Sequence, residues 1–317
     1  IIDFDCFIKR YDDFVIIIES GTLITAELAH KMQQNEKIYI LKHDSEKVQI
    51  YKHRYGSNEY TISLKDEGLE SLDVMNLKEK IESLPNYEKK LELVYQTTVS
   101  LLKRIFEGKS ETLPIEEIKL CVESIIRCID STNIPVMPEV LRLMPDEYST
   151  HHHSTNVAIF STIIGKSIGI GKSDLFDLAY AGLMHDIGKI RIDQMLLLKP
   201  SALDDHEYEL VQNHSSYGVE ILQNNGIENQ KILDAIRHHH EKLNGKGYPD
   251  QLRGKRIPKF ARIIGMCDVF DALTTRRTYR LNYTSYEALV LMKQEMADQF
   301  DVLYSDTFIR LLGSKKN

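Results

Sequence analysis

The sequence predicts a mainly α-helical protein, in which a large C-terminal helical bundle follows a small N-terminal α+β unit. Strand-like runs of β-branched and aromatic residues are concentrated in residues 1–64. From about residue 66 onward, apolar residues recur at helical spacing and strand-like runs become few. A chain of 317 residues is long enough for about two domains and a sizeable core.

The N-terminal unit is expected to combine strands with one helix. The segments IDFDCFIKR and FVIIIE predict strands, the first by alternation and the second by its β-branched residues. TAELAHKMQQN predicts a short helix, and KIYILKH and KVQIYKHR predict two further strands separated by a polar turn. Residues 1–64 contain no catalytic constellation. This unit is a candidate for sensing, dimerisation or docking, or for a structural cap.

Helical patterns dominate the rest of the chain. Residues 65–110 are predicted to form a helical connector, in which NYEKKLELVYQTTVSLLKRIFEG carries apolar residues close to helical period. Pro135 and Pro138 interrupt the pattern before the next helix. Residues 111–317 are predicted to form the large helical domain, which is almost all helix from residue 148 to the end.

Composition limits the partners and the compartment. The net charge of −7 argues against general DNA binding, although it leaves room for a local basic pocket that holds a small anion. The four cysteines form no CxxC pair, so no disulfide framework is expected and a reducing cytoplasm fits. The apolar run from Phe14 to Ile18 is too short to cross a bilayer, so no membrane span is expected.

Residue types that bind metals recur at inward-facing positions of the predicted helices. In SDLFDLAYAGLMHDIGK, the apolar stripe through Ala179 and Gly182 continues to Asp186, and His185 adjoins it. A carboxylate on a buried stripe costs free energy unless it is paired or binds a metal ion. The alternative is an aspartate at an exposed helix end, and this segment alone does not decide between the two.

Histidines occupy comparable positions on two later helices. His214 lies on the apolar stripe of EYELVQNHSSYGVEIL, where a lone histidine is more often a core residue than a ligand. In the helix that ends at HHHEKLNGKGYP, His239 and His240 follow Ile236 by three and four positions, so both share its buried face. His238 lies off that face and is expected to be solvated.

Two further helices complete the set. In HHHSTNVAIFSTIIG, either His153 or His152 extends an apolar stripe, and periodicity does not choose between them. In FARIIGMCDVFDALT, Asp268 follows Ile264 and precedes Asp271 on one flank. One shared metal cluster would satisfy all these buried groups at once, whereas a purely structural explanation needs a separate partner for each. Nitrogen and oxygen donors without thiolate suit iron, manganese or zinc, and seven ligands suit two metals bridged by one carboxylate.

The ordered motifs of residues 145–285 resemble the HD-GYP family of the HD phosphohydrolase superfamily. HDIGK at 185–189 is similar to the HD motif, and HHEKLNGKGYP at 239–249 is similar to the GYP signature. DVFDALT at 268–274 and RTYR at 277–280 follow in the order of the family. The resemblance implies an HD-type helical bundle and a bacterial cyclic di-GMP phosphodiesterase located in the cytoplasm.

The resemblance also implies two divalent metal ions, most readily iron, with manganese or zinc as alternatives. One ion would be held by His153, His185, Asp186 and Asp268. Asp186 would bridge to a second ion, whose other ligands would be His214, His239 and His240. A hydroxide between the ions would attack the phosphodiester of cyclic di-GMP and give pGpG, with further cleavage to GMP left open.

Further residues are implied to contact the substrate. Lys189 would stabilise charge on the non-bridging oxygens, with a simple cation at a helix C-terminus as the alternative. Arg277 and Arg280 would contact phosphate or base through their planar guanidinium groups. In the loop, Gly247 would let the backbone approach the ligand, and Tyr248 would lie near it.

Three departures from the family pattern bear on this expectation. Ser149 stands where some members carry a glutamate for a third metal, so two metals are expected. Asn244 replaces a common aspartate in the loop and Thr278 replaces the usual proline, which puts loop geometry and turnover in question. The main alternative is a weakly active or inactive receptor for the cyclic dinucleotide that signals through a protein partner. A nucleotidase acting on mononucleotides would not need the second set of histidines, and a homodimer is a candidate assembly.

Overall fold

The computed structural model describes four strands in the N-terminal part of the chain and most residues from 74 onward. The described residues are 6–10, 13–18, 38–41, 62–65, 74, 77–108, 111–131, 136–144, 149–197, 199, 201–275 and 283–313. The chain divides into two compact units, residues 1–71 and residues 72–317, and each is considered by itself.

The N-terminal unit contains a four-stranded sheet of order β2-β1-β3-β4. Its strands are β1 (Cys6–Arg10), β2 (Asp13–Ile18), β3 (Ile38–Leu41) and β4 (Ile62–Lys65). β1 pairs antiparallel with β2 and β3, whereas β3 and β4 run parallel. β1 and β3 lie within segments predicted as strands, β2 begins one residue before the predicted FVIIIE, and β4 was not predicted. The helix predicted at residues 25–35 and the strand predicted at 47–54 lie outside the described residues, so the mixed α+β character stays a prediction.

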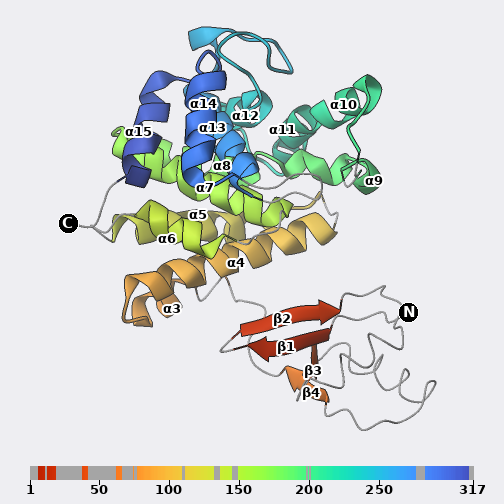
Figure 1. Cartoon of the computed structure of the whole chain (residues 1–317), viewed down its shortest axis with the longest axis vertical. Coiled ribbons are helices and arrows are strands. Elements are labelled where there is room, and N and C mark those ends of the chain that lie inside the picture. Colours follow the sequence, from red (N-terminus) through yellow and green to blue (C-terminus); the bar gives the residue numbers. More distant parts are fainter. Residues whose placement is uncertain are drawn as a thin grey trace. The chain divides into compact units, whose positions relative to one another are not determined.

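All described secondary-structure elements of the second unit are helices (Figure 1), which confirms the mainly α prediction. Its α-helices are α3 (Leu77–Ser83), α4 (Tyr87–Gly108), α5 (Ile115–Asp130), α6 (Val136–Leu143), α7 (Thr150–Ser167), α8 (Lys172–Met184), α9 (Gln194–Leu197), α10 (Asp205–Gln212), α11 (His214–Asn224), α12 (Gln230–His238), α13 (Lys259–Thr274), α14 (Ser285–Glu295) and α15 (Val302–Gly313). Two 3-10 helices, η3 (Ile187–Arg191) and η4 (Gly254–Arg256), lie between them. No helix among the described residues has the length and apolar character needed to cross a membrane.

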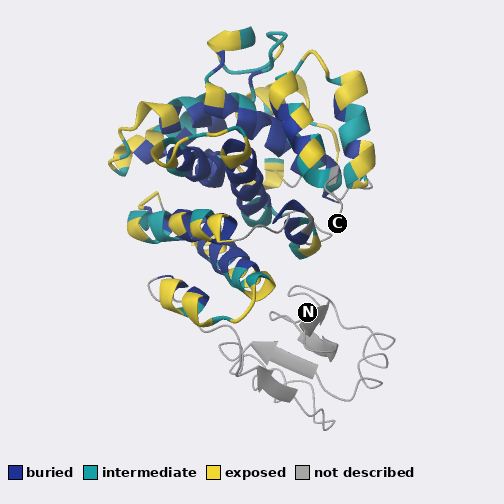
Figure 2. Ribbon diagram, turned by 90° about the vertical axis from the view of Figure 1, so that its left-hand side faces the viewer, coloured by how far each residue is buried: buried dark blue, intermediate teal, exposed yellow. Residues whose placement is uncertain are grey.

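Helix α7 forms the centre of the helical unit. Every residue from His153 to Gly165 is buried, and α4, α8 and α13 are among the helices that pack against α7. Figure 2 shows that buried residues are concentrated on the inner helices and exposed residues on the outer ones. Because α7 is buried from His153 to Gly165, a polar side chain in this stretch costs free energy unless it has a partner inside the protein.

Helix α4 is packed into the same bundle. The sequence assigned residues 65–110 to a connector, but the compact unit already begins at Leu72, and α4 contacts α5, α6 and α7. Its residues Leu91, Val94 and Leu102 are at most 2% exposed. Burial of this stripe stabilises α4 against the other helices. The described part of the segment therefore packs as a component of the bundle.

Two helix breaks fall at residues predicted to bind metal. The apolar stripe predicted one helix through Asp186, but α8 ends at Met184, and His185 and Asp186 form the turn before η3. The predicted helix around His214 is also two helices, because α10 ends before α11 begins at His214. These parts of the prediction were wrong, since neither break carries a proline or glycine that marks it in the sequence.

Candidate metal centre

The seven predicted ligand residues meet at one place in the helical unit. They come from α7 (His153), the turn after α8 (His185 and Asp186), the start of α11 (His214), the turn after α12 (His239 and His240) and α13 (Asp268). Donor atoms of Asp186, His214, His239 and His240 lie within 4.8 Å of one another, and so do those of His153, His185 and Asp268. We call these seven residues the histidine–aspartate cluster.

Helix ends orient three of the imidazoles. Each contact joins Nδ1 of a histidine to a carbonyl oxygen three residues earlier: His185 to Gly182 at 2.8 Å, His214 to Val211 at 2.6 Å and His239 to Ile236 at 2.7 Å. The last carbonyl groups of a helix have no partner within it, so a nearby imidazole N–H can donate to them. A neutral ring that is protonated on Nδ1 presents the lone pair of Nε2 to the cluster.

A carboxylate orients the fourth imidazole, that of His153. Its Nδ1 lies 2.6 Å from Oδ2 of Asp271, a fully buried residue of α13. The other oxygen of Asp271 accepts from Nδ2 of Asn156 at 2.7 Å. The amide oxygen of Asn156 in turn accepts from the hydroxyl of Tyr95 in α4 at 2.8 Å. Hydrogen-bonded partners of this kind fix the tautomer of a metal-binding histidine and make it a stronger ligand.

The structure also shows which histidine of the first triplet faces the cluster. His153 is 2% exposed and faces it, whereas Nδ1 of His152 lies 2.6 Å from the hydroxyl oxygen of Ser149. That same oxygen accepts from the backbone N–H of His152 and caps α7. The hydroxyl of Ser149 therefore serves as the cap of α7.

His238 is half-buried and hydrogen-bonded, whereas the sequence predicted a solvated side chain. Its Nε2 lies 2.9 Å from Oδ2 of Asp250, and its Nδ1 lies 2.9 Å from the carbonyl oxygen of Asp234. Arg237 binds the same carboxylate at 2.8 Å through Nε. Helical periodicity placed His238 off the buried face but gave no sign that the loop after the helix folds back over it.

Asp186 lies between the two donor groups. Its Oδ2 is 3.6 Å from Nε2 of His153, and its Oδ1 is 3.5 Å from Nε2 of His214. Asp268 also faces both groups, with Oδ1 at 3.2 Å from His153 and Oδ2 at 3.5 Å from Nδ1 of His240. Asp268, like Asp186, therefore faces histidines of both donor groups.

The cluster has the properties of a site that requires a cation. The Nε2 atoms of His153 and His185 lie 3.3 Å apart, and those of His214 and His239 also lie 3.3 Å apart. In each of these four rings, Nδ1 lies against an oxygen acceptor and therefore carries the ring proton. The Nε2 atoms that face each other then carry lone pairs, which repel one another. Oδ1 of Asp186 is buried and has no hydrogen-bond partner among the described residues. Positive charge at this place would satisfy all these atoms, so the residues fit metal ions.

Burial and charge set the protonation of the ligands. Burial lowers the pKa of His185 and His239, and it lowers that of His214 to about 4. Burial acts to raise the pKa of Asp186, but the positive charge of Lys189 and the nearby imidazoles act in the opposite direction and hold this pKa well below its usual range. Metal ligands must be deprotonated, and near neutral pH these residues meet that condition.

Two glycines let ligand-bearing segments approach closely. A Cβ atom on Gly265 of α13 would overlap the carbonyl oxygen of His239, and one on Gly188 would overlap that of His214. Because backbone lies against backbone at both places, no side chain fits there without displacing a ligand residue.

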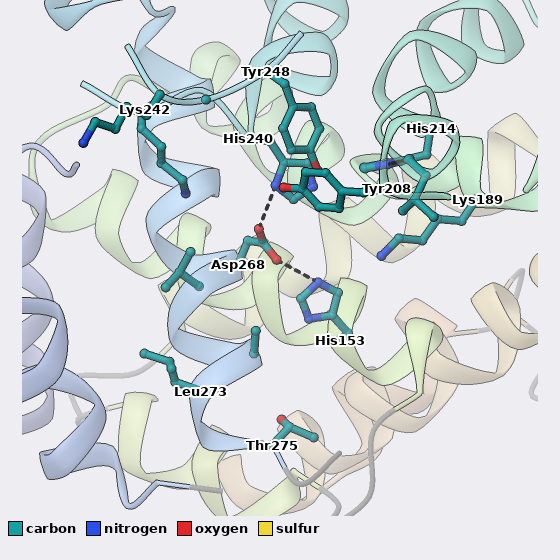
Figure 3. A pocket seen from close by; sticks show the side chains of 15 residues that line it. His153, Lys189, Tyr208, His214, His240, Lys242, Tyr248, Asp268, Leu273 and Thr275 are labelled. Carbon is teal, nitrogen blue, oxygen red and sulfur yellow. Dashed lines mark hydrogen bonds and ion pairs between the residues drawn. The ribbon is translucent and has the colours of Figure 1, made fainter. Parts of the chain in front are cut away.

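A cavity of about 430 Å³ opens onto the cluster. Figure 3 shows Asp268 between His153 and His240 on its wall, with Lys189 and Tyr248 at its edge. Helix α13 contributes an apolar strip to the same wall, made by Val269, Ala272 and Leu273. The cavity therefore combines metal-binding, cationic and apolar surfaces, a combination that suits a ligand with both phosphates and rings.

Three of the five predicted substrate contacts line this cavity, namely Lys189, Gly247 and Tyr248. The ammonium nitrogen of Lys189 lies 2.5 Å from Oδ2 of Asp186. The other two predicted contacts, Arg277 and Arg280, lie outside the described residues.

The GYP loop is held by its own side chains. The carboxylate of Glu241 accepts from the backbone N–H of Asp250 at 2.7 Å. The side-chain oxygen of Asn244 accepts from the backbone N–H of Lys246 at 3.0 Å, and its Nδ2 donates to Oδ2 of Asp298 at 3.0 Å, a contact that an aspartate could not make. A Cβ atom on Gly247 would overlap the Cα of Glu241, so this glycine is required by the packing of the loop on itself.

Some residues of the site were not predicted from the sequence. Asn156 and Asp271 lie within the sequence motifs but were assigned no role, although the position of Asp271 beside Asp268 on one flank of a helix was an available signal. Lys242 lines the cavity, and its ammonium nitrogen is buried with no hydrogen-bond partner among the described residues. Tyr95 gave no signal, because a tyrosine on an apolar stripe is typical of a core residue.

The fold and the cluster define a helical protein with a candidate metal centre, and a family model matches the same part of the chain. The model described as "HD domain" matches residues 136–302, which is more than half of the chain. The chain therefore belongs to the HD domain family and, within it, to the HD-GYP group whose motifs it carries.

Curated relatives match the same region. Cyclic di-GMP phosphodiesterase PA4108 of Pseudomonas aeruginosa is 31% identical over 174 residues, which is 55% of this chain and 42% of the relative. The 3'3'-cGAMP-specific phosphodiesterase 3 of Vibrio cholerae is 37% identical over 48% of this chain and 33% of the relative. The response regulator RpfG of Xanthomonas campestris, named a cyclic di-GMP phosphodiesterase, is 36% identical over 47% of this chain and 39% of the relative. The chain thus spans less than half the length of these relatives.

One solved structure is similar over almost the whole chain. Bd1817, an HDG"Y"P protein from Bdellovibrio bacteriovorus, aligns with a TM-score of 0.61 over 99% of this chain and 95% of its own. At 16% sequence identity this similarity concerns the fold alone.

Proposed function

We propose that this chain is a metal-dependent phosphodiesterase that hydrolyses a cyclic dinucleotide, in the first place cyclic di-GMP, to the linear dinucleotide pGpG. The observation that carries the proposal is the histidine–aspartate cluster on the wall of a cavity that Lys189 and Lys242 also line. Anionic phosphates suit the cationic wall, and flat bases suit the apolar strip of α13. The names of the relatives, which specify cyclic di-GMP or 3'3'-cGAMP, support this substrate class.

Two divalent metal ions fit the two donor groups, most readily iron, with manganese or zinc as alternatives. The first would be held by His153, His185 and Asp268, and the second by His214, His239 and His240, with Asp186 shared between them. When bound, such ions lower the pKa of a coordinated water molecule and offset charge on a phosphate.

Side chains of the cavity would orient the substrate and balance its charge. Lys189 would face the phosphate oxygens and offset the negative charge that grows on them during reaction. Arg277 and Arg280 are proposed to hold the second phosphate or a base through the planar fork of the guanidinium group. The ring centroid of Tyr248 lies 4.7 Å from that of His240, so Tyr248 would limit how the ligand lies beside the cluster.

The reaction adds one water molecule across one P–O bond of the cyclic dinucleotide. The bond from phosphorus to a ribose O3′ breaks, that oxygen gains a proton, and the phosphate stays on the 5′ oxygen of the next nucleotide. This gives pGpG from cyclic di-GMP, and a second hydrolysis would give GMP.

The test is a turnover assay on protein purified without oxygen. Separate samples are loaded with Fe²⁺ or Mn²⁺ or treated with EDTA, then incubated with cyclic di-GMP, and the products are separated by chromatography. We expect pGpG from the loaded samples only, and none from the Asp186→Asn variant. Binding of cyclic di-GMP without product under every loading condition would contradict the enzyme and support the alternative, a receptor that signals through a protein partner.

A further inference from the structure

The hydrogen bonds behind the cluster histidines are of two kinds. His185, His214 and His239 each contact a backbone carbonyl only three residues earlier, so their orientation is set within their own segment of chain. His153 instead contacts the carboxylate of Asp271 on another helix. The orientation of His153 therefore depends on tertiary packing, and that of the other three does not.

The network behind His153 reaches α4 through two further side chains. A carboxylate only accepts hydrogen bonds, so Asp271 must face the NH₂ group of Asn156, and the amide oxygen of Asn156 must face Tyr95. Tyr95 and Asp271 are 0% exposed, and Asn156 is 1% exposed. Burial raises the pKa of the Tyr95 hydroxyl, which keeps it a donor. All donors and acceptors in this chain of contacts are thus fixed.

We propose that Tyr95 is a positioning residue for the metal ion bound by His153, acting through Asn156 and Asp271. The proposal rests on the metal centre of the proposed function but not on the identity of the substrate. Tyr95 lies outside the family match at 136–302. Helix α4, which lies outside that match, therefore takes part in holding the metal ion bound by His153.

The expected effect follows from what the hydroxyl does. Without it, the buried amide oxygen of Asn156 has no donor, and the amide loses the contact that fixes its orientation. The hold of Asp271 on His153 is weakened as a result. Loss of a hydrogen bond directly behind a metal ligand lowers the affinity for the metal about 10–100-fold. Tyr95 lies two contacts beyond Asp271, so loss of its hydroxyl is expected to lower this affinity about three- to tenfold.

The test compares the full chain with its Tyr95→Phe variant. Metal-stripped protein is titrated with Mn²⁺, and the two binding steps are followed by calorimetry. We expect Tyr95→Phe to weaken one step about three- to tenfold and to leave the other unchanged, and Asp271→Asn to weaken the same step about 10–100-fold. Tyr180→Phe is the matched control, because Tyr180 is 1% exposed and its hydroxyl has no hydrogen-bond partner among the described residues. That control should change neither step.

Two single-site backgrounds identify the affected metal. The His214→Ala background keeps the donor group of His153, so Tyr95→Phe should still weaken metal binding there. The His153→Ala background lacks the ligand that Tyr95 positions, so Tyr95→Phe should have no effect on metal binding in it. Unchanged binding, equal weakening of both steps, or the same effect from Tyr180→Phe would overturn the proposal. Wild-type protein that binds no metal would overturn it together with the metal-dependent function. Normal metal binding with the predicted asymmetry but without turnover would refute only the proposed phosphodiesterase.

Discussion

Oδ2 of Asp186 accepts a hydrogen bond from the ammonium nitrogen of Lys189 at 2.5 Å. Asp186 lies inside the cluster and is only 1% exposed. The carboxylate thus meets a cation through Oδ2 while its Oδ1 faces His214 at 3.5 Å. One residue is in contact with both donor groups and with a cation that lines the cavity. Substitution of Asp186 is therefore the most informative single change in the site.

Asp186→Ala is expected to lose both metals, because it removes the ligand that lies between the donor groups. The ammonium group of Lys189 would then remain beside the cluster without its carboxylate partner and would repel metal ions. Activity should fall by more than about 100-fold, the upper end of what loss of a supporting hydrogen bond costs. Elemental analysis of the purified variant measures the metal content. Asp174→Ala, which changes an exposed aspartate on α8, is the matched control. Metal content near the wild-type value in Asp186→Ala would show that Asp268 alone serves as the shared ligand.

Lys242→Met is expected to weaken binding of cyclic di-GMP about tenfold or more, because a buried cation in the cavity loses its charge-assisted contact with the ligand. Affinity is measured by calorimetry on EDTA-treated protein, where no turnover occurs. Lys246→Met is the matched control, since Lys246 lines the same cavity but is exposed. Equal affinities for both variants would contradict a role for Lys242 in ligand binding.

Tyr248→Phe is expected to keep both metals and to change only the handling of the ligand. The phenylalanine ring can keep the contact with His240, and no oxygen of Tyr248 belongs to the cluster. Metal content and KM for cyclic di-GMP are compared in the same preparation. Loss of metal from this variant would mean that the loop supports the cluster directly.

Gly265→Ala is expected to lower the melting temperature, because its methyl group would overlap the carbonyl oxygen of His239. Forcing extra volume into a packed interior costs about 1–3 kcal/mol. Gly171→Ala is the control, since a Cβ there meets nothing within 4 Å and the residue has an ordinary φ of −65°. Thermal unfolding of the two variants is compared, and equal melting temperatures would contradict the packing described at His239.

Acid is expected to destabilise the metal-free protein. Burial lowers the pKa of His214 from 6.5 to about 4, and burial also lowers the pKa of His185 and His239. The unfolded chain takes up these protons as the pH falls below about 6.5, whereas the folded chain resists them, so stability is full above that pH and is lost below it. Each such histidine costs up to about 1.4 kcal/mol per pH unit. Melting temperatures in EDTA that stay constant between about pH 7.5 and about pH 5 would contradict this assignment.

Most residues of the cluster could be placed on buried faces from the sequence because they continue an apolar stripe, whereas periodicity left His152 and His153 open and the family resemblance chose His153. Asp186 and His239 both continue a buried face, and their burial is confirmed. The helix breaks beside them could not be predicted, since the imidazoles themselves cap the ends of α8 and α12. Capping by histidine has no proline or glycine signal in the sequence.

The second layer of the site could not be predicted for a different reason. Tyr95 and Asn156 are 61 residues apart, and their contact exists only because α4 packs on α7. Periodicity reports which face of a helix is buried but not which helix covers it. For the same reason His238 was expected to be solvated, although Asp250 in the following loop binds it.

The measurement that tests the central claim most directly is the metal content of the full chain, determined by elemental analysis after purification without oxygen. Two iron or manganese ions per chain are predicted, with both lost from the Asp186→Ala variant. No metal under any loading condition would mean that the buried histidines and aspartates serve packing alone, and would contradict the assignment of the histidine–aspartate cluster as a two-metal centre.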